Sequence, residues 1–349
     1  MIQRTPALIE ARNTDAPASW QKILAQAITE PRQLLQALAL PESLLAGMEA
    51  GHQRFGIRVP APYLARIRKG DAHDPLLRQV LPLQAETTAA PGFFDDPLAE
   101  QDSPASLSPG LIRKYRSRAL LIVSGACAIN CRYCFRRHYP YAEQQLGVAR
   151  QAEALAHIRQ DPAINEVIFS GGDPLTLNDR QLGRLARELA AMPQIRRLRI
   201  HTRLPVVIPQ RVNEELLAWL EALPVPMVMV LHINHPREID PQVHQAMEQL
   251  RAAGVTLLNQ AVLLRGVNDD ADTLEALSEA LFAAGILPYY LHGFDAVADA
   301  AHFDAGDHRA RELMRELLIR LPGFLVPKLV REVPGQASKW PLDLGLLPV

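Results

Sequence analysis

Three cysteines are the residues of this sequence whose type and spacing most directly imply chemistry. Cys127, Cys131 and Cys134 are the only cysteines among 349 residues, and they form a CxxxCxxC pattern. Thiolates bind soft metals and iron–sulfur clusters, and this close spacing lets one loop surround a single cluster. A cubane cluster has four irons, so three cysteines leave one iron open or bound by another ligand. An open iron indicates catalysis rather than simple electron transfer.

Other uses of three clustered cysteines fit the pattern less well. A structural zinc site normally has four closed ligands at paired spacings, which CxxxCxxC does not supply. Neighbours this close cannot build a disulfide framework, and an odd number would leave one thiol over. We therefore expect the three thiolates to hold a [4Fe-4S] cluster.

The composition is that of an ordinary globular protein without a strong charge bias. Hydrophobic residues make up 48% and charged residues 21%, and the formal net charge is -1 at pH 7. Such a chain lacks the basic field that drives binding to nucleic-acid phosphates or anionic lipids. We also find no signal-peptide pattern and no apolar run of the ~18 residues that a membrane-spanning helix needs. We expect a cytoplasmic protein with neither nucleic acid nor membrane as a partner.

Short β-rich runs alternate with helical patterns downstream of a long N-terminal segment. Strands and helices that alternate about every 30 residues form βαβ units, and near-continuous apolar runs suit a parallel sheet covered on both faces. We expect an α/β fold with six such units, as a partial (βα)6 barrel or an open doubly wound sheet. The runs begin at Arg118, Glu166, Arg196, Pro226, Thr256 and Pro288, so the first interval is 48 residues and the later ones are 30 to 32.

The segments outside these repeats differ from one another in composition. Helical spacing runs from Ser19 to about Met48, and a stretch rich in Pro, Asp and Ser covers 91–109 and is typical of a loop. The predicted parts are an N-terminal helical extension and linker (1–110), the barrel core (111–300), and a C-terminal helix with a final lysine-bearing segment (301–349).

Polar residues gather where the predicted strands end, and this favours the barrel. In barrels of parallel strands the active site is built by the loops at the carboxyl ends of the strands. Any single polar group there also suits an ordinary turn, but their convergence indicates one site. The groups are the three cysteines, Ser170–Asp173, His201–Arg203, His232–Asn234, Asn259–Gln260 and His292–Asp295.

The cysteine loop resembles that of radical S-adenosylmethionine (SAM) enzymes, including an aromatic residue, Tyr133, before the last cysteine. This resemblance implies that SAM binds the open iron and releases a 5′-deoxyadenosyl radical after electron transfer from the cluster. The run Ser170-Gly171-Gly172-Asp173 resembles the family's glycine-rich motif for the SAM amino group. The resemblance also assigns His232 and Gln260 to the SAM pocket.

A narrower resemblance covers about Arg58 to the C-terminus. The segments CRYCFRRHYP, SGGDPL, HTRLPVVIP, NQAVLLRGVND, PYYLHGFD and REVPGQASK are similar to those of the lysine 2,3-aminomutase family, in the same order. The similarity is closest to the branch that makes β-lysine for modifying elongation factor P. It implies an isomerase that converts (S)-α-lysine to β-lysine, with R configuration expected, and a second cofactor, pyridoxal 5′-phosphate (PLP).

The same resemblance assigns residues to the cofactor and the substrate. Lys339 matches the lysine that binds PLP covalently, and Arg118 an arginine near the PLP phosphate. Arg136 matches the arginine for the substrate carboxylate, since a guanidinium offers a planar two-pronged donor. Asp295 and Glu332 match two acids for the distal amine of lysine, although Glu332 is one methylene longer than the expected Asp.

The resemblance to this family also implies a protein partner. The family implies an electron donor such as flavodoxin or ferredoxin. We expect the family's C-terminal zinc-binding element to be absent, because the sequence continues only ten residues past Lys339. The family's oligomeric state is therefore not carried over to this chain.

Two alternative functions stay open. The first alternative is a radical SAM and PLP aminomutase acting on a different amino acid. The second is a non-catalytic cluster protein that senses oxygen or passes electrons.

Overall fold

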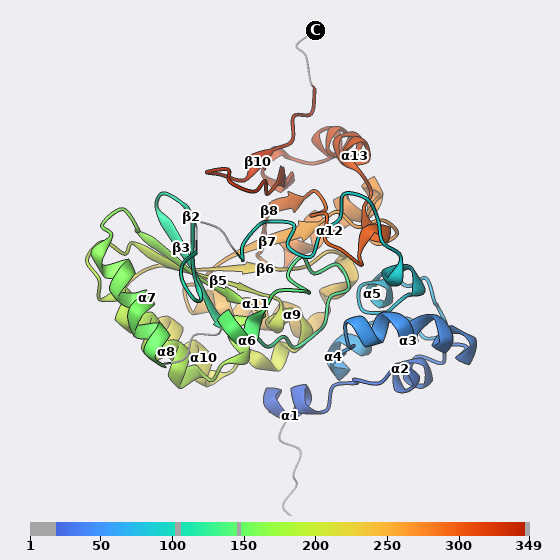
Figure 1. Ribbon diagram of the computed structural model, residues 1–349, viewed down its shortest axis with the longest axis horizontal. Helices are drawn as coiled ribbons and strands as arrows, with labels where there is room; N and C mark the ends of the chain where they lie inside the picture. The colour runs from blue at the N-terminus through green and yellow to red at the C-terminus, as the bar shows by residue number, and fades with distance from the viewer. Residues whose placement is uncertain (1–18, 102–105, 145–147, 346–349) are drawn as a thin grey trace, which may run out of the picture.

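The computed structural model describes residues 19–101, 106–144 and 148–345. Its centre is a ten-stranded sheet whose strands follow one another in chain order from β1 to β10 (Figure 1). The strands are β1 Ser106–Ser108, β2 Leu111–Tyr115, β3 Arg118–Ser124, β4 Glu166–Gly171, β5 Arg197–Thr202, β6 Met227–Leu231, β7 Thr256–Val262, β8 Leu287–His292, β9 Lys328–Arg331 and β10 Trp340–Pro341.

The strands from β3 to β8 confirm the predicted repeat. Each pairs in parallel with the next, and the sheet does not close on itself, so the fold is the partial barrel that the sequence predicts. Helices connect these strands and cover the sheet. They are α6 Tyr141–Gln144, α7 Val148–Gln160, α8 Asp179–Ala190, α9 Leu204–Val207, α10 Glu214–Glu221, α11 Pro241–Ala252, α12 Ala271–Ala283 and, after β8, α13 Asp307–Arg320.

Local sequence fixes where several of these helices begin. A short polar side chain before the first turn accepts a hydrogen bond from a backbone N–H that would otherwise lack a partner. The helices α8, α10, α11 and α12 all begin in this way. Their N-cap residues are Asn178, Asn213, Asp240 and Asp270.

Within the described residues, the N-terminal extension forms short helices rather than one continuous helix. Pro31 begins one helix, and Ala39 adopts a left-handed conformation with φ 53° just after that helix ends. These two residues break the continuous helical spacing of the sequence. The pieces are α1 Trp20–Ala25, α2 Pro31–Ala37, η1 Glu42–Leu44, α3 Leu45–Arg54, α4 Ala61–Leu64, α5 Pro75–Arg78 and η2 Gln84–Thr87.

Strands β1, β2, β9 and β10 flank the predicted six and are additions to the sequence prediction. β2 pairs antiparallel with β3, while β9 pairs in parallel with β8 and antiparallel with β10. Glu332 directly follows β9 and Lys339 directly precedes β10. The β9–β10 pairing therefore brings these two residues beside the end of β8.

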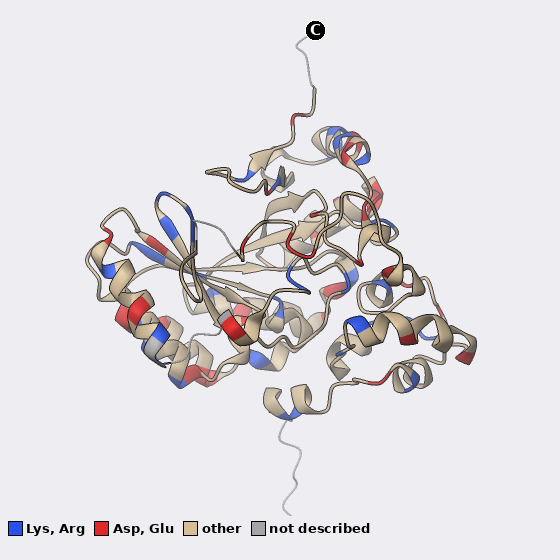
Figure 2. Cartoon of the chain, viewed as in Figure 1, with Lys and Arg blue, Asp and Glu red and all other residues tan. Residues whose placement is uncertain are grey.

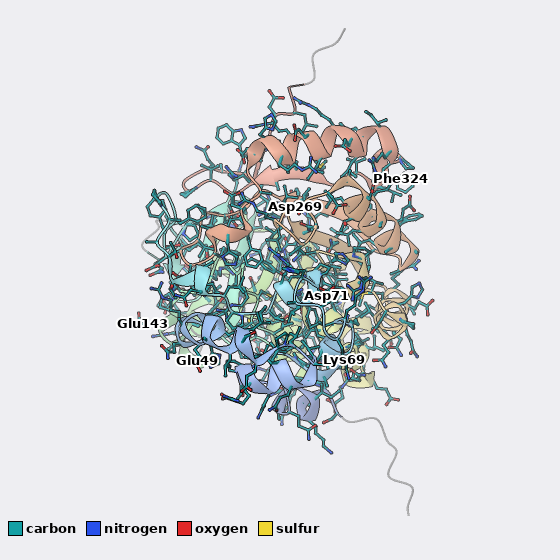
Figure 3. The ribbon with its side chains drawn as sticks, turned by 90° about the vertical axis from the view of Figure 1, so that its right-hand side faces the viewer. Glu49, Lys69, Asp71, Glu143, Asp269 and Phe324 are labelled. Atoms are coloured by element: carbon teal, nitrogen blue, oxygen red, sulfur yellow. The ribbon has the colours of Figure 1, made fainter. Side chains whose placement is uncertain are left out.

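The core is continuous from the N-terminal extension to the C-terminal helix, since Leu34, Phe169 and Leu317 belong to one cluster of buried apolar side chains. Charged residues lie mostly on the outer helices, whereas the strands carry few (Figure 2). Glu49 and Lys69 lie on the N-terminal extension, and Phe324 lies at the other end of the molecule near α13 (Figure 3). Among the described residues, no helix has the length and apolar character needed to span a bilayer.

Candidate active site

One cavity of about 330 Å³ opens at the carboxyl ends of the parallel strands. Its wall includes every residue that the sequence nominated for a cluster, cofactor or substrate. Segments that are more than 200 residues apart in the chain meet there, and consecutive parallel strands end at the same rim. These wall residues are Arg118, Cys127, Cys131, Tyr133, Cys134, Arg136, Ser170, Gly171, Gly172, Asp173, His232, Gln260, Asp295, Glu332 and Lys339.

The three cysteines follow β3 and share one corner of this cavity. Burial, and then the neighbouring Cys131, raise the pKa of the Cys134 thiol to about 11. Burial, and then Cys134, likewise raise the pKa of Cys127 well above its usual range. Thiols that act on one another in this way face the same space, as ligands of one cluster must. Within the described residues, no group of three His, Cys, Asp or Glu side chains is placed to hold a single metal ion.

The N-terminal extension holds the cysteine loop in place. Arg132 is fully buried, and it donates from Nε to Glu86 at 2.9 Å and from Nη2 to the carbonyl of Gly51 at 3.0 Å. Arg137 donates to the same Glu86 at 2.8 Å. The side chain of Asn130 donates to the carbonyl of Gly56 at 2.7 Å, and its backbone amide bonds the carbonyl of Arg58.

The glycines after β4 let that strand end approach the cysteine loop. Gly171 has φ +126°, and a Cβ atom there would lie 2.2 Å from the carbonyl oxygen of Ser124. A Cβ atom on Gly172 would lie 2.5 Å from the carbonyl oxygen of Ala126 and 3.0 Å from Sγ of Cys127. Only glycine fits this contact, so the motif forms a backbone cradle beside the cysteines.

Asp173 ends the glycine motif and has its carboxylate occupied by protein donors. It accepts hydrogen bonds from Oγ1 of Thr202 at 2.7 Å and from the amides of Arg203 at 2.8 Å, Leu204 at 2.9 Å and Leu175 at 3.0 Å. Asp173 therefore joins the loops after β4 and β5 in the cavity wall.

Tyr133 and His232 stack in the wall, with ring centroids 5.6 Å apart. The hydroxyl of Tyr133 lies 3.1 Å from Nε2 of His232 and accepts from Nδ2 of Asn234 at 2.7 Å. Burial, and then the positive charge of Arg203, lower the pKa of His232 to about 3. The imidazole is therefore neutral at physiological pH. Gln260 lies on β7 in the same wall.

Lys339 and Glu332 form an ion pair in the wall of the same cavity, where Nζ of Lys339 lies 2.7 Å from Oε2 of Glu332. Lys114 on β2 binds the other oxygen of Glu332 at 2.8 Å. Burial acts to raise the pKa of Glu332, but the cations Lys339 and Lys114 outweigh it and hold this pKa well below its usual range.

Arg136 lies in the wall with its guanidinium edge already occupied. Glu100 accepts from Nε of Arg136 at 2.7 Å and from Nη2 at 2.9 Å, while Nη1 donates to Oγ of Ser170 at 3.1 Å. Glu100 also binds Lys114 at 2.8 Å. The sequence predicts a free two-pronged donor, and the structure shows an arginine whose Nε/Nη2 edge is paired.

Several buried polar atoms of the cavity wall have no hydrogen-bond partner within the described part of the chain. Buried polar groups are almost always paired, so a set of unpaired atoms around one cavity suits a polar ligand. Arginine donors fit a phosphate, and a lysine amine fits PLP, so the residues present suit that cofactor. The atoms are Nε of Arg118, Arg199 and Arg203, Nε2 of His201 and His292, and Oδ1 of Asp295.

Sequence reasoning did not nominate Glu100, Lys114 or Arg203 for the site. Glu100 lies in the stretch predicted to be a loop, and its partner Arg136 is 36 residues away. Lys114 is one of only five lysines in the sequence, and Arg203 belongs to the polar group after β5. The polarity of strand ends was therefore the usable signal for Arg203.

Comparison with known proteins agrees with the radical SAM resemblance of the cysteine loop. Residues 121–278 match the family described as the Radical SAM superfamily. The L-lysine 2,3-aminomutase of Escherichia coli (strain K12) is 52% identical over 342 residues, which are 97% of this chain and 99% of that protein. That of Haemophilus influenzae is 46% identical over 339 residues, 97% of this chain and 98% of that protein.

A solved radical SAM methyltransferase from Sphaerobacter thermophilus is 18% identical with a TM-score of 0.44, covering 63% of this chain and 68% of that chain. The near-complete coverage by the two aminomutases, at 52% and 46% identity, decides the family. The chain belongs to the L-lysine 2,3-aminomutase family of radical SAM enzymes.

Proposed function

We propose that this protein is an L-lysine 2,3-aminomutase, an isomerase that converts (S)-α-lysine to β-lysine. One observation carries the proposal: the wall of a single cavity contains both the three cysteine thiols and Lys339, which is paired with Glu332. The first group suits a [4Fe-4S] cluster with SAM, and the second suits PLP and a substrate with a distal amine.

The bound cofactors supply the hydrogen-abstracting radical and the group on which an amino nitrogen can migrate from C2 to C3. The chain itself supplies placement. Cys127, Cys131 and Cys134 hold the cluster, while Gly171 and Gly172 let the end of β4 lie against the cysteine loop, where SAM binds. The surrounding buried wall keeps bulk water away from the reacting atoms.

The substrate's two ends are recognised by opposite charges. Because Glu100 holds the Nε/Nη2 edge of Arg136, the α-carboxylate is taken by Nη1, which lies beside Ser170 in the cavity wall. Asp295 and Glu332 take the distal ammonium group at the other end. Arg118, whose Nε has no partner among the described residues, binds the PLP phosphate. A substrate without a distal amine would leave Asp295 and the oxygen of Glu332 that Lys114 does not hold without a cation, which favours lysine over other amino acids.

The direct test is anaerobic incubation of the reconstituted protein with lysine, SAM, PLP and a reductant. We expect β-lysine in the product, with SAM regenerated rather than consumed. Cleavage of SAM without β-lysine would point to the alternative substrate, and absence of both cleavage and PLP binding would overturn the proposal.

Finer assignments rest on the resemblance to one branch of the family. We assign the product the R configuration, which chiral chromatography tests. We assign its use to the modification of elongation factor P, tested by the mass of that factor after a coupled reaction. A flavodoxin or ferredoxin serves as electron donor, and the free thiols required for a cluster favour the cytoplasm.

A further inference from the structure

Arg203 contacts one of the three cysteines and has no role in the assignments above. Its Nη1 lies 2.8 Å from Sγ of Cys131, and its side chain is 7% exposed. We propose that Arg203 is a positioning residue for the cluster: its guanidinium donates a hydrogen bond to the Cys131 sulfur and raises the cluster's reduction potential. This rests on the cluster assignment of the proposed function and not on the identity of the substrate.

The second terminal nitrogen of the guanidinium, Nη2, is held by buried partners. Nη2 of Arg203 donates to Oε1 of Gln79 at 2.6 Å and to Oε2 of Glu238 at 2.8 Å, and both partners are fully buried. The rings of Tyr63 and Tyr133 lie 5.4 and 5.8 Å from its central carbon. Turning Nη1 away from the sulfur would leave a buried carboxylate unpaired, which is costly.

The backbone of Arg203 is held as firmly as its side chain. Its amide donates to Asp173 at 2.8 Å, and the same carboxylate binds the hydroxyl of Thr202 at 2.7 Å. Arg203 therefore links the glycine-rich motif to the cysteine loop. Because both the backbone and the side chain of Arg203 are already held in place, forming the hydrogen bond to the sulfur costs little further conformational entropy.

Reduction of the cluster adds one electron, and part of that charge falls on the ligating sulfurs. Hydrogen bonds to these sulfurs stabilise the reduced form and raise the potential. A hydrogen bond from a charged donor is stronger than a neutral one. Glu238 offsets the net charge of Arg203 but not the directed bond. We expect loss of the hydrogen bond from Arg203 to lower the ratio of reduced to oxidised cluster about tenfold at a fixed potential. This corresponds to a fall of about 59 mV in the midpoint potential of a one-electron couple.

The test compares reconstituted wild type with Arg203→Lys and with the double variant Arg203→Gln/Glu238→Gln. The double variant avoids leaving Glu238 without its cation. Iron and sulfide content are measured first, and then the midpoint potential of the cluster by an EPR-monitored redox titration. We expect the midpoint to fall in the double variant and to be intermediate in Arg203→Lys, which keeps the charge but not the planar fork.

A matched control removes another buried ion pair. Arg211 and Asp179 are 2.8 Å apart, with side-chain exposures of 0% and 7%. The double variant Arg211→Gln/Asp179→Asn removes a pair of the same type, so it measures the effect of lost packing alone. Its midpoint should equal that of wild type.

A second measurement needs no variant that risks misfolding. Wild-type protein with 15N in its arginine guanidinium groups is reduced, and pulsed EPR is used to detect 15N coupling to the cluster. We expect a coupling that disappears in Arg203→Lys. Absence of this coupling in wild type, or an unchanged midpoint in the double variant at full iron content, would overturn the inference. Neither readout involves lysine turnover, so failure of the proposed substrate leaves this test intact.

Discussion

Nζ of Lys339 lies 2.7 Å from Oε2 of Glu332, so the amine assigned to PLP is ion-paired with an acid assigned to the substrate. Lys114 holds the other oxygen of Glu332 at 2.8 Å. With Lys339 holding PLP, Oε2 of Glu332 would lose this partner and could accept another ammonium group. The position that Lys339 leaves is therefore a suitable place for the distal amine of lysine.

Replacing Glu332 by Gln should weaken lysine binding more than it slows the chemistry. The change removes the negative charge next to the distal amine, and a hydrogen bond to a charged group contributes about 1.5–3 kcal/mol. We expect KM for lysine to rise by about tenfold or more, with a smaller change in kcat. Initial rates of β-lysine formation measure both. Glu316→Gln, on the partly exposed face of α13, is the matched control, and an equal KM in the two variants would contradict the assignment.

Lys339→Ala should abolish covalent attachment of PLP. A Schiff base requires a primary amine, and no other group at this position supplies one. We expect the visible absorption of bound PLP to disappear while the iron–sulfur absorption stays. Lys328→Ala, an exposed lysine at the start of β9, should keep both. Retention of the PLP absorption in Lys339→Ala would exclude Lys339 as the attachment site.

The affinity for lysine should depend on pH through Asp295. Burial, and then the negative charge of Glu332, raise the pKa of Asp295 to about 7. The carboxyl group is therefore largely protonated below pH 7, and only its ionised form attracts an ammonium group. We expect kcat/KM for lysine to rise with pH through this region. Asp295→Asn should lower kcat/KM and remove this rise, and a variant with the wild-type profile would contradict the role.

The same shift of the Asp295 pKa has an opposite consequence for stability. In the unfolded chain the carboxyl group ionises near its ordinary pKa of about 3.9. Between this value and about 7 the folded state binds the extra proton, so the contribution of Asp295 to the free energy of unfolding falls as pH rises. Asp295→Asn should lose this part of the pH dependence in urea unfolding of the cofactor-free protein.

Gly172→Ala should impair loading of the cluster. Its Cβ atom would lie 2.5 Å from the carbonyl oxygen of Ala126 and 3.0 Å from Sγ of Cys127, so the cysteine loop would have to move. We expect lower iron content per folded chain after reconstitution. Gly47→Ala in α3 adds the same methyl group where no atom lies within 4 Å, and it should load normally. Equal iron content in the two variants would show that the loop tolerates the displacement.

The sequence predicted those parts of the fold that repeat. The strands from β3 to β8 are apolar runs at regular spacing, and the polar residues at their ends converge as expected. The flanking strands were missed because they are short and carry no apolar periodicity. Pairings such as Glu100 with Arg136, or Arg203 with Cys131, depend on loops that meet only in three dimensions. A contact between two loops that are distant in the chain leaves no local pattern in the sequence from which it could be predicted.

Glu86→Gln should destabilise the protein strongly. The Glu86 carboxylate is fully buried and binds Arg132 and Arg137, whose side chains are also fully buried. Removing one charge leaves two buried cations without their anion, and breaking a buried ion pair costs about 3–5 kcal/mol. Urea unfolding measures this loss. Glu42→Gln removes the exposed partner of Arg32 and should leave stability nearly unchanged. Equal effects of the two changes would contradict this account.

The attachment of the cysteine loop to the N-terminal extension limits what can be removed from this chain. The Radical SAM match begins at residue 121, whereas the groups that fix Arg132 and Asn130 lie between Gly51 and Glu86. A fragment or chimera that keeps the matching region and discards the first hundred residues would retain all three cysteines and lose the scaffold that spaces them. The cysteine motif can therefore be transplanted only together with this distant part of the chain.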